Sequence, residues 1–573
     1  MEVMKDTKKD PAKLVRERVE GGRNHSQTRL KQWRDDWKLY RSWIDMSSRD
    51  KRRSNTFIPL TFSLVETAAA RYVLSMMGSD PIVSVLPRGS DDIDGAFGME
   101  LAMQYYLEKM GIFIPLAEVA RLLLIYGDGF IVNRWRHEKR IVMKKEPVVF
   151  MGTKIGEQEV EEERIIYDGP WGDVVAPFQV YADPYGYSVD SCRWIVVEDW
   201  VSRQQLEMDE EQGRVENVSK IGDSGGDAGD SEVFRFWKDV GYETPEGDKE
   251  MVLRWRMFED DHWITIANSE TVILDDNNPH NHQLKPVAQF PKVPQSKSFY
   301  SLSAIRPVAR LQHLINTQID QVMDRNNMTL HPLIAYDANK QIDPYRLISS
   351  PNQTVPVDGD PASSLYVHKI PELTGAVMEF VQYIRAAFDE ASGYFGYQRG
   401  FSDQRQTATV GSILNEQGDM RIRFDTMAAE EYGMRRWARL IGADIQQFMT
   451  DPVQARLTGN GRPLFPRLTP DEIMGDYDYR FTGPQSVYNR EVDRAQITEI
   501  MNLVANFPEI NRSTLAEAVI DMYPSLRIRK DSLMSGQTMP QMVESVGKTS
   551  ALSNPNNMSM PQTGKAAIQS VRG

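Results

Sequence analysis

Arginine and glutamine side chains gather in one glycine-rich and aromatic segment, residues 393–407. Its polar members with several hydrogen-bond donors are Gln398, Arg399, Gln404, Arg405 and Gln406. Guanidinium and amide groups suit phosphate oxygens, and they need no fixed register to reach them. Three glycines (Gly393, Gly396 and Gly400) permit positive backbone dihedral angles and oppose regular secondary structure. An exposed connector, whose arginines pair with acids such as Asp403, has the same composition, and composition alone favours it.

Helical periodicity flanks this segment on both sides. Before it, apolar residues recur at helical spacing over 301–327, a proline-rich insert lies between Pro332 and Pro371, and helical spacing returns over 374–393. After it, no proline occurs from Thr409 to about Met449, and the apolar pattern predicts one very long helix. The two neighbouring helices therefore set the positions of the segment's ends.

The rest of the chain alternates between helical and strand-like patterns. Helices are expected over 60–77, 92–110 and 114–126, and from Phe130 to Leu274 the apolar period changes to two, which is typical of strands. The first 54 residues are charged and helical in pattern. They carry an aromatic stripe that we interpret as buried packing: Trp33, Trp37, Tyr40 and Trp43. Together these patterns predict an α+β fold that is predominantly helical.

Composition narrows the class of protein. The residues are 41% apolar and 26% charged, which is ordinary for a soluble globular protein. A chain of 573 residues is too long for one compact core. Cys192 is the only cysteine, so no intrachain disulfide can form, and a reducing cytoplasm is the expected compartment. The amino terminus lacks the apolar core of a secretion signal, and the longest apolar stretch is far short of a bilayer span. No membrane partner is expected.

The formal net charge of −14 is a second constraint. A protein that grips nucleic acid over its whole surface needs a basic footprint, which this chain lacks. An acidic wall with a few basic residues in defined places is instead compatible with nucleic acid that slides past it.

Sequence signatures of an enzyme are not evident. The chain has no Walker A motif and no His-Glu-x-x-His motif. His262, His280 and His282 lie within one segment, but their neighbours Trp263 and Pro279 indicate a strand end and a turn, so we expect surface histidines rather than metal ligands. We predict a protein without catalytic activity, cofactor or bound metal.

The order of elements resembles the portal (head-to-tail connector) proteins of tailed bacteriophages, particularly the short-tailed group. The similarity covers roughly residues 55–525, and it is carried by the order and spacing of short motifs rather than by any single one. These motifs are Asn55-Thr56-Phe57-Ile58-Pro59, Asp80-Pro81, Gly127-Asp128-Gly129, the strand and turn over 174–184 that ends in Asp183-Pro184, and Gln406-Thr407-Ala408-Thr409-Val410.

The resemblance implies a division of the chain into named regions. They are an N-terminal helical arm (1–54), a wing of helices and strands (55–300), a first stem helix (301–327), a clip (328–373), a second stem helix (374–393), a tunnel loop (394–408), a long wing helix with its return (409–484), crown helices (485–530) and a flexible C-terminal tail (531–573).

The resemblance also implies a function. Portal proteins form a cyclic ring, twelve subunits in the finished particle, around a channel at one capsid vertex through which double-stranded DNA is packaged and ejected. Expected partners are copies of the same chain, the major capsid protein, the terminase large subunit and later tail or adaptor proteins. The expected location is the virion, after assembly in the host cytoplasm. The alternative is a helical capsid or tail adaptor, or a scaffold protein, without a DNA channel.

Site residues follow from the same resemblance. The five polar residues of the tunnel loop are expected to contact DNA phosphates. In the stem, Arg306, Arg310 and Arg325 are candidates for basic rings in the channel, with salt bridges between subunits to Asp320, Asp324 or Glu390 as an equal alternative. In the clip, docking candidates are Lys340 and Arg346, although a solvated surface explains either one alone.

Overall fold

The computed structural model describes most of the first 481 residues. The described ranges are 10–44, 53–78, 81–150, 153–222, 231–239, 250–332, 334–337, 360–368, 375–394, 423–450 and 467–481, with residues 339, 343, 347, 356, 420 and 453–454 between them. The chain divides into two compact units, Met1–Glu491 and Val492–Gly573, and every described residue belongs to the first. The predicted crown and C-terminal tail therefore lie outside the described residues.

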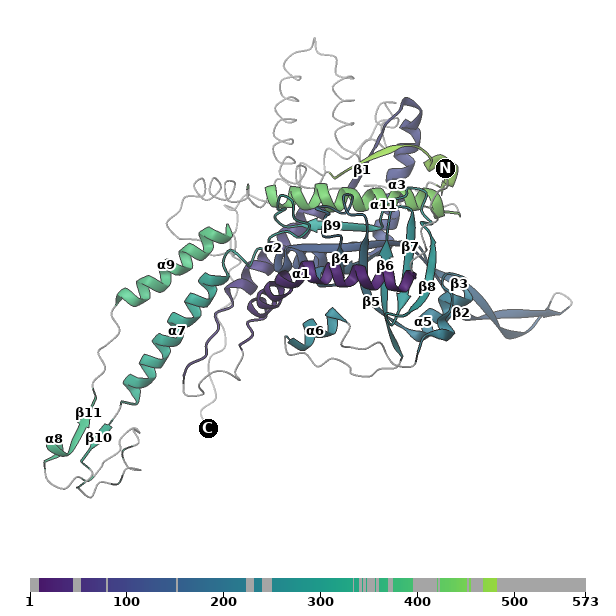
Figure 1. The fold of residues 1–573 in the computed structure, drawn as a ribbon. Helices are drawn as coiled ribbons and strands as arrows, with labels where there is room; N and C mark the ends of the chain where they lie inside the picture. The colour runs from purple at the N-terminus through teal and green to yellow at the C-terminus, as the bar shows by residue number, and fades with distance from the viewer. Residues whose placement is uncertain are drawn as a thin grey trace, which may run out of the picture. The chain divides into compact units, whose positions relative to one another are not determined.

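The described helices cover much of the first unit (Figure 1). They are α1 (Pro11–Tyr40), α2 (Leu60–Met77), α3 (Ile93–Met110), α4 (Phe113–Tyr126), α5 (Arg203–Glu211), α6 (Glu232–Asp239), α7 (Ala309–Leu330), α8 (Pro361–Ser364), α9 (Gly375–Ser392) and α11 (Arg435–Phe448). Each described helix is too short or too polar to cross a bilayer.

The strands form antiparallel sheets. Five strands pair in the order β4 (Val180–Ala182), β5 (Ile195–Ser202), β6 (Met251–Phe258), β7 (His262–Ala267) and β8 (Thr271–Asn277), and three pair in the order β3 (Thr153–Val175), β2 (Asp128–Phe150) and β9 (Val287–Pro291). Two-stranded pairs are β1 (Val83–Pro87) with β14 (Tyr477–Phe481), β10 (Ile334–Tyr336) with β11 (Leu365–Val367), and β12 (Val453–Gln454) with β13 (Arg467–Leu468). The mixture of helices and sheets agrees with the predicted α+β class.

Helix α1 joins two hydrophobic cores. Near its start, Val15 and Val19 pack on the five-stranded sheet, and near its end Trp33 enters the main core, where its indole Nε1–H donates to the Tyr126 carbonyl at 2.9 Å. The aromatic stripe is therefore buried as expected at Trp33 and Tyr40, but the prediction is wrong for Trp43, which is exposed and stacks with a lysine. A helix of 30 residues can reach both cores because each residue adds about 1.5 Å.

The turn between α4 and β2 contacts the segment around Ser301, which leads into α7. Gly127 has φ of +101°, a left-handed conformation that favours glycine. The next residue, Asp128, is fully buried and accepts the Ser301 amide at 2.6 Å and the Gln289 side-chain amide at 2.9 Å. Burial raises the pKa of Asp128 to about 6. The turn thus holds the segment that leads into α7.

The first stem helix begins later than the sequence pattern suggested. Helix α7 starts at Ala309, whereas the apolar periodicity began at Ser301. Leu302 instead forms a β-bridge with Val293, and Pro307 follows within a turn. The intervening apolar residues are buried, which explains the helix-like pattern without a helix. The second stem helix, α9, occupies the range in which the sequence predicted it.

A π-helical turn interrupts the predicted long helix. The described part runs from residue 423, contains the π turn Glu430–Met434, and ends with α11 at Phe448. A Cβ atom on Gly433 would lie 2.4 Å from a ring carbon of the buried Phe290, so only glycine fits at this contact. The wider π turn brings the backbone against β9. A search for apolar residues at 3.6-residue spacing does not detect such a turn.

The same π turn carries a buried carboxyl, Glu430, and gives a prediction about pH. Burial raises the pKa of Glu430 from 4.5 to about 8. The folded chain therefore binds this proton more tightly than the unfolded chain, and the stabilising effect of the neutral acid is lost as pH rises through about 8. We expect Glu430→Gln to match the wild type near pH 5 and to be more stable by about 2–4 kcal/mol above pH 8.

Urea denaturation between pH 5 and 9 measures this difference. The neighbouring Glu431 is exposed, so Glu431→Gln is the matched control and is expected to follow the wild type at every pH. Some pH dependence remains in Glu430→Gln because burial also raises the pKa of Asp36 to about 7 and that of Asp128 to about 6. Parallel pH profiles for Glu430→Gln and the wild type would refute the assignment.

Candidate nucleic-acid interface

Helices α7 and α9 form a two-helix stem that lies side by side in Figure 1. Their contact near the wing buries Ile315 of α7 and Ile384 and Phe388 of α9. Both helices lead toward the small β10–β11 sheet at the far end of the stem (Figure 1). Buried apolar residues therefore anchor the two helices at one end. Their turns at the other end are largely exposed to solvent in a single chain.

The stem helices carry more acids than bases. Their basic residues are Arg310, Arg325 and Arg385, and their acidic residues are Asp320, Asp324, Glu379, Asp389 and Glu390. An excess of carboxylates repels phosphate, so this stem is unsuited to gripping a nucleic acid tightly.

Arg306 has a partner within its own chain. Its Nη2 lies 2.9 Å from Oδ1 of Asp36, a buried residue of α1, and also donates to the Gln32 carbonyl at 2.5 Å. Ser303 donates its hydroxyl to the other oxygen of Asp36 at 3.0 Å. Burial is the main cause that raises the pKa of Asp36 to about 7. Arg306 lies in the turn before α7 and joins α1 to the base of the stem, a role that the sequence did not indicate.

The other two stem arginines lie on α7 itself. Arg310 is exposed in the first turn, and Arg325 is partly buried near the far end. Their assignment to basic rings in a channel remains a prediction, because that assignment concerns neighbouring chains.

Four polar side chains along α7 hold the segment 54–61 by its backbone. Asp324 accepts the Ser54 amide and Asp320 accepts the Thr56 amide, both at 2.6 Å. Asn316 accepts the Ile58 amide at 3.2 Å. Gln312 donates to the Ile58 carbonyl at 2.7 Å and accepts the Thr61 amide at 3.3 Å. We call residues 312, 316, 320 and 324 the α7 polar ladder.

The spacing of this ladder has a simple geometric cause. Four residues of an α-helix rise about 6 Å, and two residues of extended chain advance about 6.6 Å, so the amides of Ser54, Thr56 and Ile58 meet successive ladder residues. Gln312 breaks this spacing, because it accepts the amide of Thr61. Asp320 and Asp324, which the sequence offered as salt-bridge partners between subunits, thus serve as backbone acceptors in their own chain. The four-residue spacing is visible in the sequence, but its partner segment lies more than 250 residues away.

The remaining candidate residues lie outside the described residues. These are all five polar residues of the tunnel loop and both clip candidates, Lys340 and Arg346. Of the predicted tunnel loop, only Tyr394 is described, and it is buried in the main core. The expected DNA and docking contacts of these residues stay predictions.

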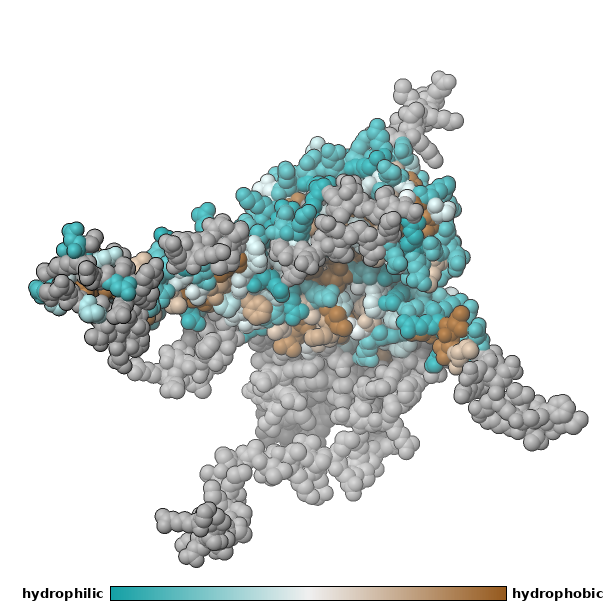
Figure 2. Space-filling view, turned by 90° about the horizontal axis from the view of Figure 1, so that it is seen from below, coloured by the Kyte–Doolittle hydropathy of each residue, from teal (hydrophilic) through white to brown (hydrophobic). Residues whose placement is uncertain are grey.

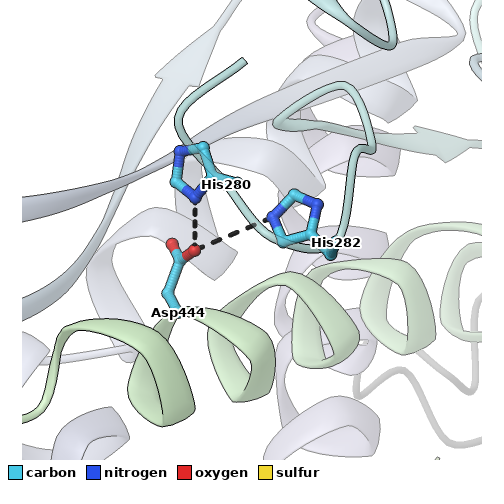
Figure 3. A group of neighbouring side chains, drawn as sticks. All are labelled: His280, His282 and Asp444. Atoms are coloured by element: carbon cyan, nitrogen blue, oxygen red, sulfur yellow. Dashed lines mark hydrogen bonds and ion pairs between the residues drawn. The ribbon is translucent and has the colours of Figure 1, made fainter. Parts of the chain in front are cut away.

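A separate polar cluster joins the turn after β8 to α11 (Figure 3). Asp444 of α11 is fully buried, and its Oδ1 lies 2.7 Å from Nδ1 of His280 and 3.7 Å from Nε2 of His282. Its Oδ2 accepts the side-chain amide of Asn133 at 2.6 Å. The prediction that these two histidines lie on the surface is wrong, because α11 covers their turn. Hydrogen bonds from the histidines hold the pKa of Asp444 below its ordinary value, although burial opposes them.

The hydrogen bonds of His282 decide what this cluster can do. Its Nδ1 accepts the Leu284 backbone amide at 2.9 Å, so the neutral ring carries its proton on Nε2, the nitrogen that faces Asp444. A metal ligand needs a free electron pair at that nitrogen. The three side chains are close enough to suggest a metal site, but this tautomer favours an N–H pointing at a carboxylate. We therefore interpret the cluster as a structural link between the turn and α11.

The paired helices α7 and α9 flank the small β10–β11 sheet, in the order of elements on which the sequence resemblance rests. Residues 150–523 match the family described as Phage SU10 portal protein, which is more than half of the 573 residues. The chain belongs to this family of phage portal proteins. The expected resemblance to portals of the short-tailed type is thereby confirmed, and the family is structural rather than enzymatic. No curated protein matches the chain.

Proposed function

We propose that this protein assembles into a closed ring with cyclic symmetry, which encloses a channel for double-stranded DNA at one capsid vertex. The observation that carries the proposal is the family match, which spans the stem, the clip and the tunnel-loop segment. Two helices of one chain cannot surround a duplex, so several copies must meet through a heterologous interface that closes, and twelve is the number expected for the finished particle.

The charge of the stem supports a channel with little friction. Each phosphate held firmly by a basic residue adds affinity and resists translocation. The acidic excess on α7 and α9 offsets that attraction, and contacts to phosphate rather than to bases do not depend on sequence. Such a wall suits packaging and ejection of any genome sequence.

The tunnel loop supplies the few contacts that such a channel needs. Arg399 and Arg405, with Gln398, Gln404 and Gln406, donate hydrogen bonds to phosphate oxygens of the passing duplex. The loop's aromatic residues Phe395, Tyr397 and Phe401 pack against neighbouring loops, because duplex DNA presents no open base face, whereas Tyr394 is buried in the main core of its own chain. Arg310 and Arg325 add basic positions along the stem.

The remaining partners dock on other regions. The clip, with Lys340 and Arg346, binds the terminase large subunit during packaging and tail or adaptor proteins afterwards, while the outer wing meets the major capsid protein. The ring assembles in the host cytoplasm and remains in the virion.

The double variant Arg399→Ala/Arg405→Ala tests the channel assignment. We expect rings of normal mass and about tenfold less DNA retained per particle, since two phosphate contacts are lost from every subunit. DNA per particle is measured by nuclease protection in a packaging assay. The matched control is Arg439→Ala/Arg480→Ala, which removes the same charge at two exposed positions of the wing. Normal packaging by the tunnel-loop variant would exclude the assignment.

A further inference from the structure

The β2–β3 hairpin extends well beyond the strand that covers it. Strand β9 pairs with β2 only over Asp128–Val132, whereas β2 and β3 pair along nearly their whole length. Beyond β9, residues 139–144 of β2 and 161–166 of β3 are all exposed, and we call them the outer hairpin (Figure 1). Each of its strands has one edge without a strand partner among the described residues. A two-stranded ribbon of this kind is only marginally stable alone in water.

The two edges of the outer hairpin carry opposite charges. The β2 side has three basic residues and no acid, namely Lys139, Arg140 and Lys144. The β3 side has one base, Arg164, against three acids, namely Glu161, Glu162 and Glu163. Within the hairpin, Lys144 lies 3.2 Å from Glu162, and Lys139 lies 3.9 Å from Glu163. These ion pairs are exposed and contribute little, so the charges can also interact with a second partner.

Large apolar side chains lie on the same ribbon. Ile141 is 66% exposed and Met143 is 57% exposed, and Val142, Ile165 and Ile166 are also exposed. The register places Ile141 opposite Glu163 and Lys139 opposite Ile165, so Ile141, Met143 and Ile165 share one face. Apolar surface is visible on this hairpin at the right of Figure 2. Exposed aliphatic residues beside open strand edges are typical of a surface that another strand covers.

We propose that the outer hairpins of neighbouring copies pair edge to edge, the basic β2 edge of one copy against the acidic β3 edge of the next. This inference rests on the ring proposed above. Opposite charge on the two edges is self-complementary from head to tail, which is the form of contact that closes a ring. The strand order β2-β3-β2-β3 continues the antiparallel pattern, and its backbone hydrogen bonds satisfy both open edges. The apolar residues Ile141, Met143 and Ile165 of neighbouring copies then lie on the same face of the continued sheet.

A charge-exchanged chain tests the pairing without disturbing the hairpin itself. In this variant the basic edge becomes acidic and the acidic edge becomes basic through Lys139→Glu, Arg140→Glu, Lys144→Glu, Glu161→Lys, Glu162→Lys and Glu163→Lys. Opposite charges still face each other within the hairpin and between identical copies. When it is co-expressed with the wild-type chain, however, its acidic β2 edge meets an acidic β3 edge. We expect each chain to form its own rings, with mixed rings at least tenfold below random mixing.

Native mass spectrometry of rings from two chains with different affinity tags measures the mixing. The control exchanges six exposed charges on α1 and α5 and is expected to mix randomly: Lys13→Glu, Arg16→Glu, Lys31→Glu, Glu20→Lys, Glu207→Lys and Glu211→Lys. Random mixing of the hairpin-exchanged chain would overturn the edge pairing but leave the ring intact. Wild-type chains that form no ring at all would instead overturn the proposed function.

A pair of one-sided variants gives a second readout. A chain with only the three β2 substitutions has two acidic edges, and a chain with only the three β3 substitutions has two basic edges. We expect neither to form rings alone and an equal mixture to form them, because alternating copies restore opposite charges at every contact. Rings formed by either variant alone would contradict the proposal.

Discussion

Replacing Asp444 with alanine is expected to lower the free energy of unfolding by about 3–5 kcal/mol. The carboxylate is fully buried and receives hydrogen bonds from His280 and Asn133, with the Nε2–H of His282 facing it. Its removal leaves two buried N–H groups, on His280 and Asn133, without an acceptor, and each such group costs about 1–3 kcal/mol. Urea denaturation followed by tryptophan fluorescence measures the loss, since Trp437 lies on the same helix.

Gln447→Ala is the control for this experiment. Gln447 joins the same turn to the same helix through Asn281 and Pro279, but both of its hydrogen bonds are exposed. We expect it to cost less than about 1 kcal/mol. Equal effects of the two substitutions would show that the buried cluster adds nothing beyond ordinary contacts between the turn and α11.

Replacing Gly127 with alanine is expected to destabilise the protein by more than about 3 kcal/mol, for two separate reasons. The φ angle of +101° is unfavourable for any residue with a Cβ atom. The added Cβ would also lie 2.5 Å from the Ser301 carbonyl oxygen, which belongs to backbone and cannot rotate away. The displaced Ser301 segment leads into α7, so we also expect weaker ring assembly.

Gly111 provides a matched control at the end of the preceding helix. Its φ is +70°, and a Cβ atom there would meet nothing within 4 Å. Gly111→Ala therefore measures the conformational cost alone, about 1 kcal/mol. The difference between the two variants in urea denaturation isolates the overlap with Ser301. Equal costs would contradict this account of the turn.

Local patterns in the sequence predicted many elements because they depend on neighbouring residues. Helices α2, α3, α4 and α9 lie where apolar periodicity indicated, and strands occupy the region with a period of two. The pattern failed over 301–308, where apolar residues are buried without being helical. Buried apolar residues in a short irregular segment can have the same three- or four-residue spacing as the buried face of a helix, as Ile305 and Val308 do here.

Long-range contacts explain what could not be predicted. His280 and His282 lie in a turn, as their neighbours indicated, but α11 covers that turn from 164 residues further along the chain. Arg306 meets Asp36, and the α7 polar ladder meets the segment before α2, over comparable separations. For the candidate site, the order of motifs along the sequence was sufficient to identify the family. The spacing of charged residues in the sequence did not predict which residue each of them contacts.

Imaging of the purified full-length chain tests the central claim most directly. Negative-stain electron microscopy, combined with mass photometry of the same sample, should show rings with a stain-filled central hole and a mass near twelve times 65.5 kDa. Closed dimers or other compact particles without a hole would contradict a DNA channel and would favour an adaptor or scaffold role.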